Sequence, residues 1–485
     1  MKRKTTVSIL SFLVLFSLVF IYLNEVFKSE HHYINTSEDF TVLAEKTNID
    51  VIFYGSSHSY TAFNPLIVDD ICKTVSYNLG SDALKVELTD LVLVESLKKT
   101  KPKLVILEVY PPTLRPVKGK EDKAFHLRAM DVVPNVSLLK AEKTLKIYEP
   151  KEYLGVMFPL IRNHSKWKTN KFFNLSRRKK LDSTKNYFYG GFIGAINVMS
   201  LEEQEKYKDF NKEPLNNDPN RSWLTDLAKE DIKRFVDLAK NTGAEVLIVS
   251  SPDPRARVSF NYYIFSELET LCHSLDISFL NLNDYLNEMN LNVIDFKDNS
   301  HLNTYGSTKA TMFLANYIKE HYSLKDRSTD DVWKFSQKKH AEFKNMYSFF
   351  KPVSFKRELN ETVLKFITIK ELEILSYQKE KLNFRVKLDS SFIGSGEENK
   401  YRLAIHIYPK DDHKEMLSDR NKSIKRNYDL DDFVLDGKNN FSLEINTKIK
   451  NIKKIELFLF DKDGYKGVIG ERVKIKDIFF QSRKN

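Results

Sequence analysis

Residues Ile49 to His58 read IDVIFYGSSH, and this stretch decides how the chain folds. Val51 to Tyr54 are four β-formers in a row, which predicts a buried strand. Gly55 then permits a sharp turn, because glycine adopts backbone angles that other residues avoid. Two serines and a histidine follow at the carboxyl end of the strand, where ligands and nucleophiles lie in open α/β sheets. The alternative is a purely structural loop in which a serine caps the next helix.

Further strands and helices alternate along the chain after this stretch. This spacing predicts an α/β domain with a doubly wound parallel sheet. The strands that we expect after the first are residues 75–80, 103–110, 245–250 and 277–282. The helices that we expect are residues 65–73, 87–100, 223–241, 260–274 and 307–322.

The remaining segments suggest an insertion and a second domain. Residues 115–225 lack strand alternation, and we interpret them as a largely helical insertion over one end of the sheet. Residues 323–350 predict a connecting helix. After Pro352, several short stretches alternate with period two, which is typical of a small β-sandwich. These stretches are 382–388, 401–408, 441–445 and 454–460. The expected domains are therefore an anchor at 1–28, a catalytic domain at 29–350 and an accessory sandwich at 351–485.

The N-terminus carries a candidate transmembrane helix. Lys2, Arg3 and Lys4 precede an apolar run from Val7 to Leu23, whose helix would be about 26 Å long and just cross a bilayer core. A cleaved signal peptide is the alternative, but no small-residue cleavage site follows the run. We therefore expect an uncleaved single-pass anchor with its N-terminus in the cytoplasm and the bulk of the chain outside. The polar residues 28–47 predict a short tether.

Composition narrows the class of partner. Lys and Arg number 77 against 66 Asp and Glu, which gives a net charge of +11. No nucleic-acid-binding motif accompanies this charge, so we expect an anionic envelope polymer or lipid surface instead of nucleic acid. Cys72 and Cys272 could pair, but nothing in the sequence requires it. We see no spacing typical of metal ligands and expect no cofactor.

A second stretch far downstream supplies the partners that a nucleophilic serine needs. Residues 298–306 read DNSHLNTYG, so an aspartate precedes a histidine by three residues. A serine needs a base to act as a nucleophile, and the base needs a carboxylate to orient it. Ser57, His301 and Asp298 are thus a candidate triad. Each also has a structural alternative, as a helix cap for Ser57 or Asp298 and as a core histidine for His301.

With GSSH at one end and DNSH at the other, residues 48–325 resemble the SGNH/GDSL hydrolase superfamily. Within it the chain is most similar to the membrane-anchored, DltD-like D-alanyl transfer proteins. The resemblance implies a flavodoxin-like sheet, with Ser57 as nucleophile, His301 as general base and Asp298 as its orienting acid. It also implies that Gly80, in Asn78-Leu79-Gly80, donates to the oxyanion beside the Ser57 amide, and that Asn78 belongs to the same oxyanion and substrate-binding block. The third family block departs from the pattern, because the segment after the third strand, residues 107–112, contains no asparagine.

Three more residues are candidates for the cleft. His58 directly follows Ser57 and can be a substrate contact or a satisfied loop histidine. Glu108 ends the third strand and can point into the crevice or be a surface group. His164 can line the cleft from the insertion, although a lone histidine near a tryptophan is more often structural.

These features favour a serine-dependent acyl-ester enzyme on the outer face of a membrane. We expect O-acyl (acetyl) transfer to a cell-surface polysaccharide or teichoic-type polymer. The resemblance implies a membrane-bound O-acyltransferase as the partner that presents the acyl group. An esterase that removes acyl groups from the same glycans is the first alternative. A non-catalytic envelope glycan-binding protein is the second.

Overall fold

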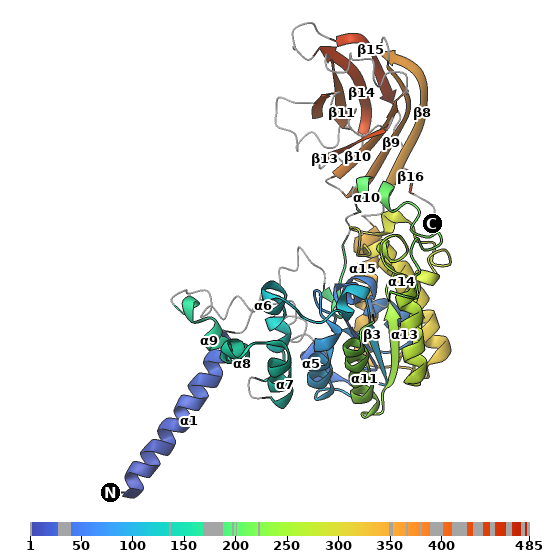
Figure 1. The fold of residues 1–485 in the computed structure, drawn as a ribbon. Coiled ribbons are helices and arrows are strands. Elements are labelled where there is room, and N and C mark those ends of the chain that lie inside the picture. Colours follow the sequence, from blue (N-terminus) through green and yellow to red (C-terminus); the bar gives the residue numbers. More distant parts are fainter. Residues whose placement is uncertain are drawn as a thin grey trace. The chain divides into compact units, whose positions relative to one another are not determined.

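The computed structural model divides into two compact units, Met1–Phe343 and Lys344–Asn485, which are described separately (Figure 1). In the first unit the structure describes residues 2–27, 40–134, 137–167, 188–195, 198–199, 201–221 and 224–343. In the second it describes residues 344–348 and the strands β8 to β16 that are given below. The basic run Arg177–Lys180 of the expected insertion lies outside the described residues.

The first unit is an α/β domain built on a parallel sheet, as the alternation predicts. Its five strands lie in the order β2-β1-β3-β6-β7, and every neighbouring pair is parallel. Counted along the sheet this is the 2-1-3-4-5 order, whose reversal falls between β1 and β3. The strands are β1 Val51–Tyr54, β2 Ser76–Asn78, β3 Leu104–Glu108, β6 Glu245–Ser250 and β7 Ser278–Asn281.

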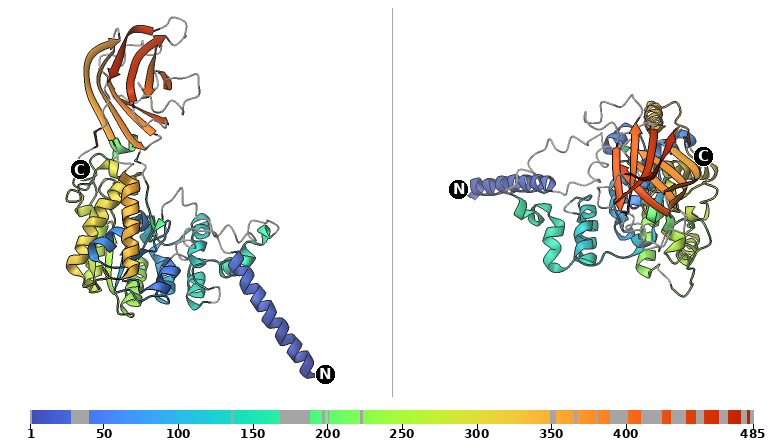
Figure 2. Two further views of the ribbon diagram at one scale, coloured as in Figure 1. Left: turned by 180° about the vertical axis from the view of Figure 1, so that it is seen from behind. Right: turned by 90° about the horizontal axis from the view of Figure 1, so that it is seen from above.

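Helices bury both faces of this sheet, which explains why its strands are continuous apolar runs. Val51 and Phe53 of β1 pack in the core of one face, whereas Ile52 and Tyr54 pack in the core of the other. Helices α4 and α14 cover the first face, and α5, α11 and α13 cover the second (Figures 1 and 2). The bounds are α3 Ser57–Ala62, α4 Pro65–Cys72, α5 Val86–Leu97, α11 Asp226–Lys240, α12 Arg255–Val258, α13 Tyr263–Ser274 and α14 Thr304–His321.

The two cysteines lie in these opposite cores and form no disulfide. Cys72 of α4 contacts the core of the first face, and Cys272 of α13 is buried in that of the second. The sheet separates them, so the pairing that the sequence left open does not occur.

The segment between β3 and β6 is largely helical in its described part, as expected. It begins with the short 3₁₀ helix η1 and also contains one two-stranded hairpin that the sequence pattern did not predict. Its elements before α11 are η1 Pro111–Leu114, α6 Lys120–Met130, α7 Leu138–Ile147, η2 Pro150–Glu152, α8 Tyr153–Met157, α9 Pro159–Arg162, η3 His164–Lys166, β4 Phe188–Tyr189, β5 Phe192–Ile193 and α10 Leu201–Lys206.

Buried ion pairs tie helix α7 to the sheet domain. The ammonium of Lys143 lies 2.9 Å from a carboxylate oxygen of Asp90 in α5 and 3.9 Å from one of Asp231 in α11. Both Lys143 and Asp90 are almost fully buried. Because a buried charge is costly unless it is paired, each of these groups depends on the other.

Replacing Lys143 by alanine is therefore expected to destabilise the first unit. Loss of one partner of a buried pair costs about 3–5 kcal/mol, and we expect about 3 because Arg234 still lies 3.1 Å from Asp90. Denaturant unfolding of the full-length chain in detergent micelles measures the effect. The control is Lys151→Ala, since Lys151 is exposed and pairs only at the surface with Glu149. Equal unfolding free energies for the two variants would show that the buried pair contributes no stability.

Helix α1 (Lys2–Val26) is long and apolar enough to cross a membrane over residues Thr5–Val26. The tether prediction for residues 28–47 is wrong in its second half, because residues 40–46 are helical. Phe40 is buried there, and its ring meets that of Tyr77 edge-on at 5.3 Å. Residues 28–39 lie outside the described part.

Helix α15 (Asp331–Ser348) is the predicted connecting helix, and it spans the boundary between the two units. The second unit contains two antiparallel sheets, with the orders β13-β10-β9-β8-β16 and β12-β11-β14-β15. The four stretches of period-two alternation all form strands, as predicted. The strands are β8 Val353–Leu364, β9 Ile367–Gln378, β10 Lys381–Leu388, β11 Tyr401–Pro409, β12 Ile424–Asp429, β13 Asn440–Asn446, β14 Ile452–Asp461, β15 Val468–Lys476 and β16 Gln481–Ser482.

Candidate active site

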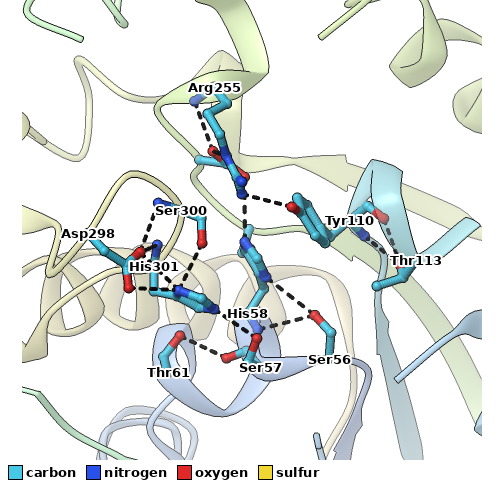
Figure 3. Close-up of polar contacts among 12 residues, drawn as sticks. Ser56, Ser57, His58, Thr61, Tyr110, Thr113, Arg255, Asp298, Ser300 and His301 are labelled. Carbon is cyan, nitrogen blue, oxygen red and sulfur yellow. Dashed lines mark hydrogen bonds and ion pairs between the residues drawn. The ribbon is translucent and has the colours of Figure 1, made fainter. Parts of the chain in front are cut away.

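The candidate triad lies at the carboxyl edge of the parallel sheet, where the strand order reverses. Ser57 follows β1, Tyr110 follows β3, Arg255 follows β6, and His301 comes from the loop that precedes α14 (Figure 3). Residues that are far apart in the sequence thus come together at this edge of the sheet. This is the usual position of a ligand site in a doubly wound sheet.

Ser57 is presented by the first turn of α3. The capping role belongs to its neighbour, because the Ser56 side chain accepts a hydrogen bond from the His58 amide at 3.1 Å. The Ser57 side chain instead meets the imidazole of His301, with Oγ 2.8 Å from Nε2. The helix-cap interpretation therefore applies to Ser56, and Ser57 is left with the geometry of a nucleophile beside its base.

Asp298 and Ser300 fix the orientation of the His301 ring. Nδ1 of His301 lies 2.9 Å and 3.1 Å from the two carboxylate oxygens of Asp298, and 2.8 Å from Oγ of Ser300. Because both partners can accept a hydrogen bond, they favour the tautomer that carries its proton on Nδ1. Nε2 then faces Ser57 with a free lone pair, as a general base requires.

Asp298 is held in its charged form. Partial burial raises the pKa of its carboxyl group, but hydrogen bonds from His301 and from the Ser300 and His301 amides outweigh burial and hold the pKa well below its usual range. The cap of α14 is Asn303, whose side chain accepts from the amides of Tyr305 and Gly306. Asp298 is therefore not the cap of that helix, and it remains available to the imidazole.

His58 packs directly behind the triad. Its ring stacks on Tyr110 with centroids 3.9 Å apart, and its centroid lies 4.6 Å from that of His301. Burial lowers the pKa of His58 to about 4, although the nearby Asp253 carboxylate, 3.4 Å from Nε2, acts in the opposite direction. At neutral pH a neutral ring therefore packs against His301 and adds no positive charge beside its imidazole.

Asp253 and Arg255 complete this support, and the sequence reasoning missed both of them. The guanidinium of Arg255 forms two hydrogen bonds to the Asp253 carboxylate, at 3.0 and 2.8 Å, and a third to the Tyr110 hydroxyl at 2.8 Å. The sequence does hold one signal for Asp253 and Arg255, because both follow a predicted strand that ends at the same edge of the sheet as Ser57. Ser300, the second partner of His301 Nδ1, was also missed.

Glu108 is buried beneath the loop that carries Ser57, so the interpretation as a surface group is wrong. Its Oε2 atom accepts hydrogen bonds from the Ser56 amide at 3.0 Å and the Ser56 hydroxyl at 2.9 Å. Gly55 has a φ of +133°, and a Cβ there would lie only 2.7 Å from atoms of Glu108. Glycine is thus needed both for the turn and for this close contact. Burial raises the pKa of Glu108 to about 7, against the opposing effect of the two Ser56 hydrogen bonds.

This raised pKa predicts a pH-dependent stability that Glu108→Gln removes. Between pH 4.5 and 7 the unfolded chain releases the Glu108 proton while the folded chain keeps it, so wild-type stability falls as pH rises. The fall is about 3 kcal/mol for a shift of this size. The difference in unfolding free energy between Glu108→Gln and wild type should therefore shift by about 3 kcal/mol in favour of the variant from pH 4.5 to 7. Above pH 7 this difference should stay constant. Denaturant unfolding at a series of pH values measures the difference, and a difference independent of pH would contradict the assignment.

Of the two backbone amides expected to donate to an oxyanion, those of Ser57 and Gly80, the Gly80 amide already donates to a side chain in this structure. The Ser57 amide lies in the first turn of α3, where a helix offers no acceptor of its own. The Gly80 amide, however, donates to Oδ1 of Asn78 at 2.9 Å. Asn78 also accepts from the Ser59 hydroxyl and donates to the carbonyls of Ser59 and Phe63. In this structure the Asn78 side chain therefore holds α3 in place and accepts the Gly80 amide, and the expected substrate contacts of the two residues stay a prediction.

His164 does not line the cleft. It lies exposed in η3, where Nδ1 is 3.0 Å from the Ile161 carbonyl. This part of the insertion packs against α1, since the Asn163 side chain donates to the Phe27 carbonyl at 2.9 Å. Among the described residues no contact joins His164 to Ser57, His301 or Asp298.

Comparison of the chain with models of known protein families found no match, and comparison with curated proteins found none either. We therefore base the proposed function on the geometry of Ser57, His301 and Asp298.

Proposed function

We propose that this protein is a serine-dependent acyl-ester enzyme of the SGNH type that acts on the outer face of a membrane. One observation carries the proposal. The Ser57 hydroxyl, the two nitrogens of His301 and the Asp298 carboxylate form a continuous chain with contacts of 2.8 and 2.9 Å. Nucleophile, base and orienting acid have this relation in acyl-transfer enzymes on several unrelated folds.

The chemistry proceeds in two steps. Oγ of Ser57 attacks the acyl carbonyl while Nε2 of His301 takes the serine proton, and the Ser57 amide donates to the oxyanion. Collapse of the tetrahedral intermediate breaks the bond to the leaving group, which receives the proton from His301 and leaves an acyl ester on Ser57. An acceptor hydroxyl then attacks this ester, its proton passes through His301, and Ser57 is regenerated. The negative charge of Asp298 stabilises the imidazolium in both steps.

We further propose that the acceptor is a sugar or polyol hydroxyl of an envelope polymer. Support comes from α1, which would anchor the enzyme beside the bilayer with Lys2, Arg3 and Lys4 on the cytoplasmic side. Tethering favours transfer from an acyl donor presented by a membrane partner, such as a membrane-bound O-acyltransferase, because it raises their effective concentration.

Product partition separates transfer from hydrolysis. The full-length protein in detergent micelles, given an activated acyl ester and an oligosaccharide, is expected to form acylated sugar in preference to free acid. Mass spectrometry of the products measures the ratio, and the Ser57→Ala variant supplies the uncatalysed background. Rapid release of free acid that added oligosaccharide does not change would identify an esterase instead.

A further inference from the structure

The α8–α9–η3 segment, Tyr153 to Trp167, joins the anchor helix to the catalytic domain. Helices α8 and α9 lie beside the C-terminal end of α1 (Figures 1 and 2). The ring of Phe158, between them, meets the ring of Phe20 edge-on at 5.2 Å. The Leu160 amide donates to the Asn24 side chain at 3.1 Å, and this satisfies a polar group that is fully buried at the end of an apolar helix.

These contacts place the segment at a definite depth relative to α1. Phe20 precedes the end of the candidate span at Val26 by six residues, which is about 9 Å along a helix axis. The 22 residues of Thr5–Val26 are about 33 Å long, close to the thickness of a bilayer's hydrocarbon core. With α1 inserted, the Phe158 ring would therefore lie within the outer leaflet and not above it.

The segment also exposes apolar side chains that the domain does not cover. The exposed fractions are 63% for Leu154, 37% for Ile161 and 50% for Trp167. Every charged residue from Tyr153 to Lys180 is basic. Exposed aliphatic and aromatic groups together with basic charge are the composition of segments that lie at the boundary of headgroups and acyl chains.

We infer that Tyr153 to Trp167 forms an interfacial element that lies in the outer leaflet of an anionic membrane beside α1. This inference rests on the membrane anchor of the proposed function. Its occupant is lipid, because the segment continues the surface of a helix that lipid surrounds. Arg162 connects the segment to the preceding helices, since it pairs with Asp131 just after α6, and it also donates to the Gly155 carbonyl within the segment at 3.1 Å.

Quenching of tryptophan fluorescence by brominated lipid tests this inference. The full-length protein is reconstituted into vesicles of phosphatidylcholine and phosphatidylglycerol whose acyl chains carry bromine near the headgroup. Part of the wild-type emission is expected to be quenched, and that part should be missing in Trp167→Phe. The double variant Leu154→Glu/Ile161→Glu should lose most of this quenching, because it places charges at the boundary. Leu215→Glu, a change at an apolar residue that is 77% exposed outside the segment, should keep it.

Flotation of the same samples after a salt wash separates the possible failures. Vesicles that carry the protein while Trp167 stays unquenched would overturn the interfacial element and leave the anchor intact. Protein that does not float with the vesicles would overturn the anchor and this inference together. Labelling of Ser57 with a soluble fluorophosphonate should be unchanged in the Leu154→Glu/Ile161→Glu variant, so the proposed chemistry is judged independently of the membrane contact.

Discussion

Replacing Ser57 by alanine is expected to reduce turnover of an activated acyl ester to the uncatalysed background, and His301→Ala should do nearly the same. In the proposed mechanism Ser57 forms the covalent bond, and in the described part of the chain His301 is the only base in contact with its hydroxyl. In a working triad, loss of the serine or the histidine lowers kcat by about 10⁶-fold. Ester turnover by the full-length protein in detergent micelles measures the loss.

The double variant Ser57→Ala/His301→Ala makes this prediction specific to a triad. Because the two residues act as one unit, the double variant should be little worse than either single one. The matched control is Ser266→Ala, a change of the same kind on helix α13 at a residue that lies outside the site and is exposed. Full turnover in Ser57→Ala with folding intact would exclude Ser57 as the nucleophile, and multiplicative losses would show that the two residues act separately.

Asp298→Asn is expected to cost about 10⁴-fold in kcat, the loss that the same change causes in serine proteases. The asparagine oxygen can still accept from the Ser300 and His301 amides, so the loop should keep its shape. Its amide group, however, can donate to Nδ1 of His301, which favours the tautomer whose proton faces Ser57. The variant also loses the charge that stabilises the imidazolium.

Two control variants test whether the loss of kcat in Asp298→Asn is specific to the Asp298 charge. Ser300→Ala removes the other partner of Nδ1 but leaves the charge of Asp298, so its loss should be far smaller than that of Asp298→Asn. Asp226→Asn changes a fully exposed carboxylate at the start of α11 and should leave kcat unchanged. Equal activity of Asp298→Asn and wild type would mean that another group orients His301.

Local pattern predicted the sheet because its strands are buried on both faces. Residues such as Val51 and Ile52 face different cores, so the strand is apolar at every position and stands out from its neighbours. Features that depend on distant partners were missed. The helix at residues 40–46 forms where Phe40 meets Tyr77, and the Phe188–Ile193 hairpin lies where the Asn78 amide donates to the Gly190 carbonyl at 2.8 Å. Neither contact has a signal within its own stretch of sequence.

The contrast between local sequence pattern and contacts with distant residues also explains which parts of the site could be predicted. The contact among Ser57, His301 and Asp298 could be predicted because two short motifs place residues of these types near the two ends of the sheet domain. The support from Asp253 and Arg255 was missed, because it depends on how β6 lies beside β3 and not on any local spacing. The structural role of Asn78 was missed for a related reason. The sequence shows that a side-chain amide is present, but not that this amide bonds to α3 and to Gly80 within the fold.

Covalent labelling of Ser57 is the most direct test of the claim that this chain is a serine acyl-ester enzyme. The full-length protein in detergent micelles is treated with a fluorophosphonate, digested and analysed by mass spectrometry. The predicted result is a single adduct on the peptide that contains Ser57, lost in Ser57→Ala and strongly slowed in His301→Ala. A folded protein that takes up no label, or takes it up at another serine with Ser57 unmodified, would contradict the claim.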